Sequence, residues 1–389
     1  MKKQAVAAVL LCTLSAYAIP AHAETAVPGG TDEAVVSGTS ASVSASSSDA
    51  SAAVAAFEGD SDLTLEKAIQ LGIENSYNLQ QALNTYKRNG ISLENAADNL
   101  DYIPTEDSGS AEDRSAWKSY TSSNISYIAA AQNIETVKEQ IAYSMVQTYY
   151  KVLSAESSVK EAEEALDIAR LEEKAAAAKA EKGKISVSDN KSVIQARVEA
   201  EQALTTAESA LEQERKTLNN AIGADTGTVF SLVDRPKYTE PKELDVKAYT
   251  QQVMGQAPTI RQAEQNVELA ELDIRYFTWN SDGDFELTRM SVDEANQELT
   301  HSKEELEQSI SSTYYNQQNL HDQYEQQQTA LATAQDALEL AEKKNARGLI
   351  TKLEVKKAQQ SVNQAQRKLE DLILQIDEAQ RVLDQPWIS

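Results

Sequence analysis

Side chains able to do enzyme chemistry are few and scattered in this chain. Only three histidines and one cysteine occur in 389 residues, and of these only His301 and His321 lie beyond residue 23. Neither a glycine-rich phosphate-binding loop nor a Gly-x-Ser-x-Gly nucleophile motif is present in the sequence. The many carboxylates recur at the spacing of helix surfaces, which is typical of solvated faces. We therefore predict that the protein is not an enzyme and has no cofactor and no metal site.

Two short turns stand out instead. Each places a basic residue and a glycine at a helix end, followed by a Ser or Thr that can cap the next helix. The turns are Lys182-Gly183-Lys184-Ile185-Ser186 and Arg347-Gly348-Leu349-Ile350-Thr351. This pattern predicts two long helical hairpins with compact tips.

Both turns belong to an internal duplication. Residues 148–204 match residues 313–369 without a gap at an offset of 165, and the segments that begin at Leu63 and Leu244 match at an offset of 181. Duplication with helical spacing is typical of a regular assembly of repeats. It predicts helical-hairpin repeats at 63–223 and 244–389, joined by a connector at 224–243 with one short strand.

The front of the chain predicts export. A basic start, the apolar stretch from Ala5 to Ala18 and the small-x-small motif Ala21-His22-Ala23 are typical of a signal peptide at residues 1–23. Cys12 lies inside it, so the mature chain has no cysteine. The stretch 24–62 contains no Lys or Arg and is rich in Ser and Ala, which predicts a disordered linker.

Charge excludes one class of partner. The net charge of −25 becomes −27 once Lys2 and Lys3 leave with the signal peptide, which argues against nucleic acid. No stretch after the signal approaches the ~20 apolar residues of a membrane-spanning helix.

Heptad patterning supports the hairpins. Apolar residues near the C-terminus alternate spacings of three and four, and a similar stripe in the first repeat lies beside a second row at Leu204, Leu211 and Leu218. Two apolar rows on one helix predict neighbours on two sides, as in a sheet or tube of helices; an ordinary antiparallel coiled coil is the alternative. The two stripes are Val355, Ala358, Val362, Ala365, Leu369, Leu372, Ile376, Ala379 and Leu383, and Val193, Ala196, Ala200, Ala203, Ala207 and Ala210.

Together these motifs resemble the TolC-like outer-membrane efflux protein family over about residues 63–383. The resemblance rests on the opening Leu63 to Ile69, the step from Asn75 to Leu79, the paired Thr-Tyr-Tyr, the two Gly-x-Ile-[Ser/Thr] tips and the ending from Leu218 to Gly223. The helical patterning predicts an all-α chain. The resemblance implies a homotrimer whose hairpins form a twelve-helix α-barrel, open to the outside through a β-barrel, as the exit duct of a tripartite efflux or type I secretion system. Its partners would be a periplasmic adaptor (membrane fusion) protein and an inner-membrane transporter. The adaptor-docking tips would be Gly183, Lys184, Ile185, Gly348, Leu349 and Ile350.

One departure from the family pattern concerns its β-barrel. Family members insert a strand hairpin between the first and second helix of each copy, and a barrel strand needs ~9 to 11 residues of alternating polarity. The matching stretches 101–123 and 276–293 are too short and too polar. We therefore expect a reduced or absent β-barrel, and membrane insertion is not expected from these stretches.

Aromatic residues gather at both shortened stretches. The sequence favours simple packing of the loops, and the alternative is contact with lipid headgroups or a partner there. Tyr149, Tyr150, Tyr314 and Tyr315 are interpreted as packing residues. The clustered aromatics are Tyr102, Trp117, Tyr120, Tyr127, Tyr276, Phe277, Trp279 and Phe285.

The resemblance also implies a tunnel constriction. In the family, acidic residues lie six and nine positions after the second tip glycine; Glu354 keeps the first, Lys357 replaces the second, and Asp189 is the first-copy equivalent of Glu354. A threefold ring of these carboxylates would narrow the tunnel and favour cations. The alternative is a solvated helix face.

Two hypotheses for the whole chain follow. The first is the exit-duct component described above. The second is an exported structural coiled-coil spacer of the cell envelope, which would need the hairpins but no docking partner.

Overall fold

The computed structural model describes residues 62–104, 109–241, 243–277, 279 and 283–388. The predicted signal peptide and all but the last residue of the predicted linker lie outside this part of the chain.

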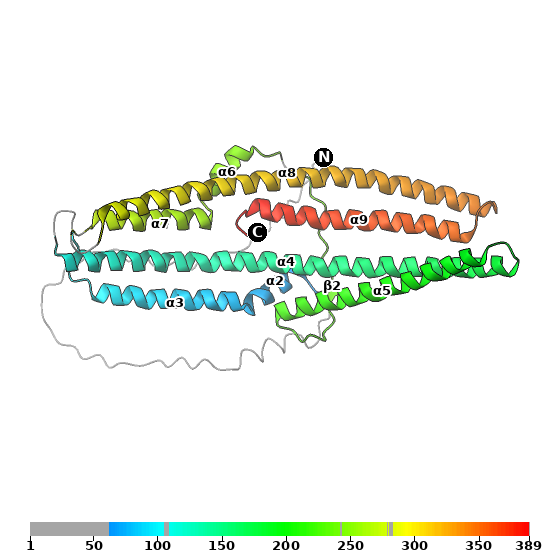
Figure 1. The fold of residues 1–389 in the computed structure, drawn as a ribbon, viewed down its shortest axis with the longest axis horizontal. Coiled ribbons are helices and arrows are strands. Elements are labelled where there is room, and N and C mark those ends of the chain that lie inside the picture. The colour runs from blue at the N-terminus through cyan, green and yellow to red at the C-terminus, as the bar shows by residue number, and fades with distance from the viewer. Residues whose placement is uncertain (1–61, 105–108, 242, 278, 280–282, 389) are drawn as a thin grey trace, which may run out of the picture. The chain divides into compact units, whose positions relative to one another are not determined.

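Eight helices in two sets of four make up the described duplication. In each set, two short helices precede a long helix that packs against both the second short helix and the helix after the turn (Figure 1). The predicted fold class, duplicated long helical hairpins, is confirmed. The first set is α2 (Leu65–Glu74), α3 (Tyr77–Asp98), α4 (Ala111–Glu181) and α5 (Val187–Ile222), and the second is α6 (Val246–Met254), α7 (Pro258–Arg275), α8 (Phe285–Ala346) and α9 (Lys352–Asp384).

Sequence explains the length of the long helices. No Gly or Pro interrupts the 71 residues of α4 or the 62 residues of α8, and either residue would weaken a helix interior. Ser110 begins α4 with a capping box, in which its side chain accepts from the Asp113 amide while the Asp113 carboxylate accepts from the Ser110 amide.

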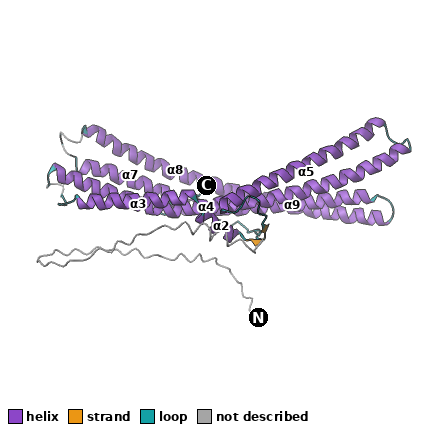
Figure 2. Ribbon diagram, turned by 90° about the horizontal axis from the view of Figure 1, so that it is seen from below, coloured by secondary structure: helices purple, strands orange, loops and turns teal. Residues whose placement is uncertain are grey.

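The connector between the sets contains the short strand that its apolar run indicates. β2 (Ser231–Leu232) pairs in parallel with β1 (Asp62–Leu63), with Leu63 opposite Leu232. Figure 2 shows how little of the described chain is strand.

Tyr149 anchors the first repeat at this point. Its ring is 0% exposed, and its hydroxyl donates to the Leu63 carbonyl at 3.0 Å and accepts from the Asp234 amide at 3.1 Å. Burial raises the pKa of Tyr149 to about 12. The packing role predicted for this residue is confirmed, with the addition that its hydroxyl ties the strand pair to α4.

The predicted heptad packing is confirmed in α9, whereas the prediction for α5 is partly wrong. All nine stripe residues of α9 are buried or half-buried. In α5, however, Ala196, Ala203 and Ala210 are exposed. The row that includes Leu204 and Leu211 faces α4 instead, because a leucine removes more apolar surface from water than an alanine.

At both shortened stretches the described residues contain no strand. Between α7 and α8, the Phe277 ring lies 5.2 Å from those of Trp279 and Phe285, and Tyr276 is buried. Packing therefore accounts for several of the aromatics, although Trp279 is 71% exposed. Within the described chain, none of the helices is both long enough and apolar enough to span a membrane.

Candidate functional site

Both hairpin tips have the same backbone. Gly183 and Gly348 take left-handed φ angles of 64° and 74°. In the first tip, the Gly183 amide donates to the Ala180 carbonyl and the Lys184 amide to the Lys179 carbonyl, at 2.8 and 2.9 Å. The second tip repeats this pair of bonds around Gly348 at 2.8 and 3.0 Å. This is the Schellman motif, which closes a helix and favours glycine at its left-handed residue.

Side chains at the tips differ between the copies. Leu349 is 69% exposed, whereas Lys184 occupies the equivalent exposed position in the first tip. Ile185 and Ile350 are half-buried. At equivalent exposed positions, the second tip therefore presents an apolar residue and the first tip a basic one. Backbone hydrogen bonds hold both turns.

The two carboxylates predicted to line a constriction have a local role. Asp189 and Glu354 are the third residues of α5 and α9, and each completes a capping box with Ser186 or Thr351. The Thr351 amide donates to a Glu354 carboxylate oxygen at 2.7 Å. This hydrogen bond lowers the pKa of the Glu354 carboxyl. Both residues are exposed at helix starts, and a constriction formed by them stays a prediction.

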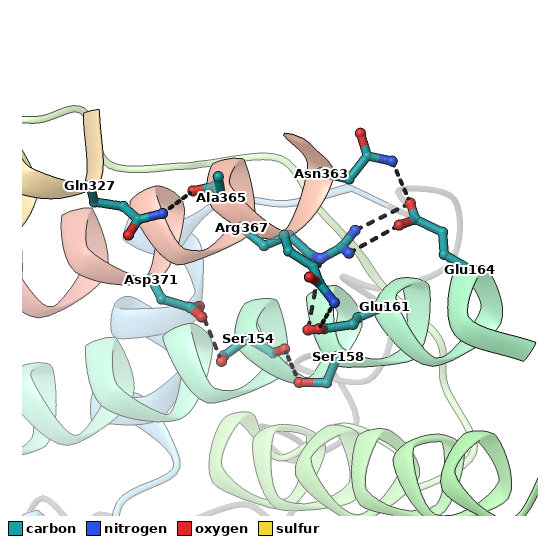
Figure 3. A network of polar contacts seen from close by, with 10 residues as sticks. Ser154, Ser158, Glu161, Glu164, Gln327, Asn363, Ala365, Arg367 and Asp371 are labelled. Carbon is teal, nitrogen blue, oxygen red and sulfur yellow. Dashed lines mark hydrogen bonds and ion pairs between the residues drawn. The ribbon is translucent and has the colours of Figure 1, made fainter. Parts of the chain in front are cut away.

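A seam of polar contacts joins the two repeats along α4 and α9 (Figure 3). At its centre, Arg367 makes two parallel hydrogen bonds to Glu164, at 3.0 and 3.2 Å, and Asn363 adds a third at 2.9 Å. Nearer the tips, Lys356 pairs with Asp167 at 3.0 Å. Bidentate pairing fixes the register of two helices as well as contributing energy.

Farther from the tips, hydroxyl groups donate hydrogen bonds to the carboxylates of the seam. The Tyr150 hydroxyl donates to Asp377 at 2.6 Å, and Arg381 donates to the same carboxylate oxygen at 2.7 Å. Ser154 donates to Asp371 at 3.3 Å. Burial raises the pKa of the Asp371 carboxyl, and the Ser154 hydrogen bond only partly opposes this.

The seam was not predicted from the sequence, where its carboxylates were interpreted as solvated. The two helices carry opposite charges, as ion pairs require: Glu164 and Asp167 lie on α4, and Lys356 and Arg367 lie on α9. Their pairing depends on which helices become neighbours. Charge spacing along one helix carries no such information.

The raised pKa of Asp371 predicts the direction in which its substitution changes the stability of the protein. Its raised pKa means that the folded state binds the proton more tightly than the unfolded state, so the ionised form costs stability. Asp371→Asn should therefore stabilise the protein at pH 7, by less than about 1 kcal/mol. The gain should vanish as the pH falls below about 4, where the ordinary aspartate also takes up a proton.

Thermal unfolding at a series of pH values measures this difference. Asp377→Asn is the matched control, because that carboxylate is bonded to both Tyr150 and Arg381 and its loss should destabilise. A destabilised Asp371→Asn variant at pH 7 would contradict the assignment.

Comparison with known proteins agrees with this geometry. Residues 277–387, which contain α8 and α9, match the family described as outer membrane efflux protein. No curated protein sequence matches the chain. The match confirms the resemblance to TolC-like proteins and the expected class, an exported protein of the cell envelope.

Solved structures share the fold. The outer membrane protein VceC from Vibrio cholerae superposes with a TM-score of 0.64 at 14% identity, covering 83% of this chain and 95% of that one. The outer membrane channel CmeC from Campylobacter jejuni gives 0.62 at 12% identity, with coverages of 83% and 85%. CusC, in a study of transmembrane channel formation, gives 0.62 at 14%, with coverages of 84% and 92%.

Proposed function

We propose that the protein is the exit-duct component of an efflux or secretion system, assembled as a homotrimer. The observation that carries this proposal is the exposed part of the alanine stripe of α5. Ala196, Ala203 and Ala210 are exposed in the single chain although their spacing is that of a helix interface. Small residues let a neighbouring helix approach closely, and a neighbouring copy would cover them. The family match to outer membrane efflux proteins supports the same conclusion.

The tips are the proposed docking points for a periplasmic adaptor. Leu349 is an exposed apolar side chain on a turn whose backbone is fixed, which suits it to anchor a partner. An inner-membrane transporter would then join through the adaptor. The spacer alternative keeps the hairpins but assigns no role to Leu349.

Assembly is the direct test of the duct. In Ala203→Glu, a charged side chain is added to the exposed row without entering the α4–α5 interface. We expect it to lower the trimer population at least tenfold at micromolar concentration while helix content is unchanged, because an uncompensated charge would be buried between copies. Light scattering with circular dichroism measures both quantities, and Ala203→Ser is the matched control.

A mature wild-type protein that remains a dilute, stable monomer would remove the duct and favour the spacer. So would a trimer that tolerates Ala203→Glu together with equivalent changes at Ala196 and Ala210.

A narrowing of the tunnel at Glu354 is part of this proposal. Its capping box holds the carboxylate at the start of α9, close to the tip. Threefold symmetry would repeat that negative charge around the axis, where it would favour cations.

A further inference from the structure

A polar groove lies between α3 and α4, and the end of α5 closes one side of it. Its volume is about 720 Å³, within the range of about 300–1,000 Å³ typical of small-molecule sites. The floor is apolar and consists mainly of Gly72, Ala82, Val137, Ile141 and Met145. The rim carries amides and hydroxyls.

The groove is unusual in its lack of charge. A quarter of the chain consists of charged residues, yet the sixteen residues that line the groove include no Asp, Glu, Lys or Arg. Six are amides, and each amide can donate and accept hydrogen bonds at once. The amides are Asn75, Asn78, Gln81, Asn133, Gln140 and Asn220.

Two of the six amide side chains are hydrogen-bonded within the chain, and the other four are available to a ligand. Asn75 donates to the Leu71 and Ile222 carbonyls, both at 2.9 Å, and so joins the helices that close the groove. Gln81 donates to the Tyr77 hydroxyl at 2.9 Å, which fixes a ring that is 73% exposed. The other four amides are exposed and make no hydrogen bond to another described residue. They can therefore bind a ligand without breaking bonds within the chain.

The duplication supplies a second groove with different chemistry. Between α7 and α8 lies a groove of about 530 Å³. Gln262, Ala263 and Ser309 there are the equivalents of Gln81, Ala82 and Ser144, at the two offsets of the repeat. Glu298 and Glu305, however, replace Asn133 and Gln140. The two grooves lie at equivalent places in the repeats but differ in charge, so the first is not neutral merely because of the fold.

We propose that the groove between α3 and α4 binds an uncharged oligosaccharide that carries acetamido groups. Sugar hydroxyls both donate and accept, and the free amides match them in both roles. The exposed Tyr77 ring offers a flat apolar face on which a sugar ring can stack. The apolar floor suits the acetamido methyl groups. An extended peptide would instead add as a strand to a free sheet edge, and the residues that line this groove come from helices and the turn between α2 and α3.

The test uses the mature protein in its native assembly and a probe of defined chemistry, the β-1,4-linked tetramer of N-acetylglucosamine. Isothermal titration should detect binding to the wild type. The double variant Asn133→Glu and Gln140→Glu should weaken that binding at least tenfold. Because the second repeat carries glutamates at the equivalent places on α8, the substituted α4 should still fold, and circular dichroism checks this.

The matched control alters the second groove by Glu298→Asp and Glu305→Asp, which keep its charge, and it should leave the affinity for the tetramer unchanged. Maltotetraose, which has no acetamido group, should bind at least tenfold more weakly.

Four results would overturn the proposal. They are no binding by the wild type, equal binding by the charged double variant, binding of a neutral Gly-Ser decapeptide in place of the sugar, and cross-linking from position 133 to a neighbouring copy of the chain. The last would show that a second copy fills the groove.

Discussion

Export should fall to near background when Gly183 and Gly348 are both replaced by Val, while trimer formation and helix content persist. Both glycines have left-handed φ angles, and a β-branched residue there costs at least about 1 kcal/mol per tip. Apart from the glycine and its two chain neighbours, no heavy atom lies within 4 Å of a β-carbon built at either site. The damage therefore arises from the backbone and stays at the turn. The distorted turn would shift Leu349 and Ile350 away from their proposed docking positions.

Export assays in cells, with light scattering on the purified variant, measure the two effects separately. Gly227→Val is the matched control, because a β-carbon there also meets open space and the residue has no left-handed φ. Cross-linking from position 349 to an adaptor in the otherwise unmutated protein should succeed. Normal export by a folded, trimeric double variant would remove the tips from the mechanism.

Loss of the Tyr149 side chain should have the largest effect on stability. Tyr149→Ala should lower the free energy of unfolding by about 3 to 5 kcal/mol, as for large buried aromatics. Tyr149→Phe keeps the ring but leaves the Asp234 amide without its partner and the Leu63 carbonyl with only the Val233 amide at 3.4 Å. This change should cost about 1 to 3 kcal/mol. Denaturant unfolding at a fixed protein concentration measures both losses.

The duplication provides a matched control in Tyr314, the equivalent residue of the second repeat. It is partly buried, and its hydroxyl makes no hydrogen bond to another described residue. Tyr314→Phe should therefore change stability by no more than about 0.5 kcal/mol. Equal losses in the two Tyr→Phe variants would refute the role of the Tyr149 hydroxyl.

Alkaline pH tests the same residue independently. Since the folded pKa of Tyr149 is about 12, above the ordinary value of about 10, the unfolded chain ionises first. The stability that the buried phenol contributes should be complete below pH 10 and should decline as the pH rises toward 12. The advantage of the wild type over Tyr149→Phe should shrink over the same interval.

Sequence patterns by themselves determined the helices and the turns between them. The absence of Gly and Pro over α4 and α8, the heptad stripe of α9 and the paired glycine turns are local properties. Each acts within one helix or one turn, so it can be recognised before the neighbours are known. The duplication added the repeat architecture, because two copies of one pattern predict two copies of one hairpin.

Only the tertiary structure decided which faces meet. Both rows of α5 have heptad spacing. The leucine row packs against α4, because the larger side chains bury more apolar surface, and Ala203 in the other row stays exposed. Glu164 and Arg367 lie 203 positions apart, and their pairing requires α4 and α9 to be neighbours. The neutral groove likewise depends on α3, α4 and α5 converging. Periodicity fixes what a helix can bury, whereas the competition among possible partners fixes what it does bury.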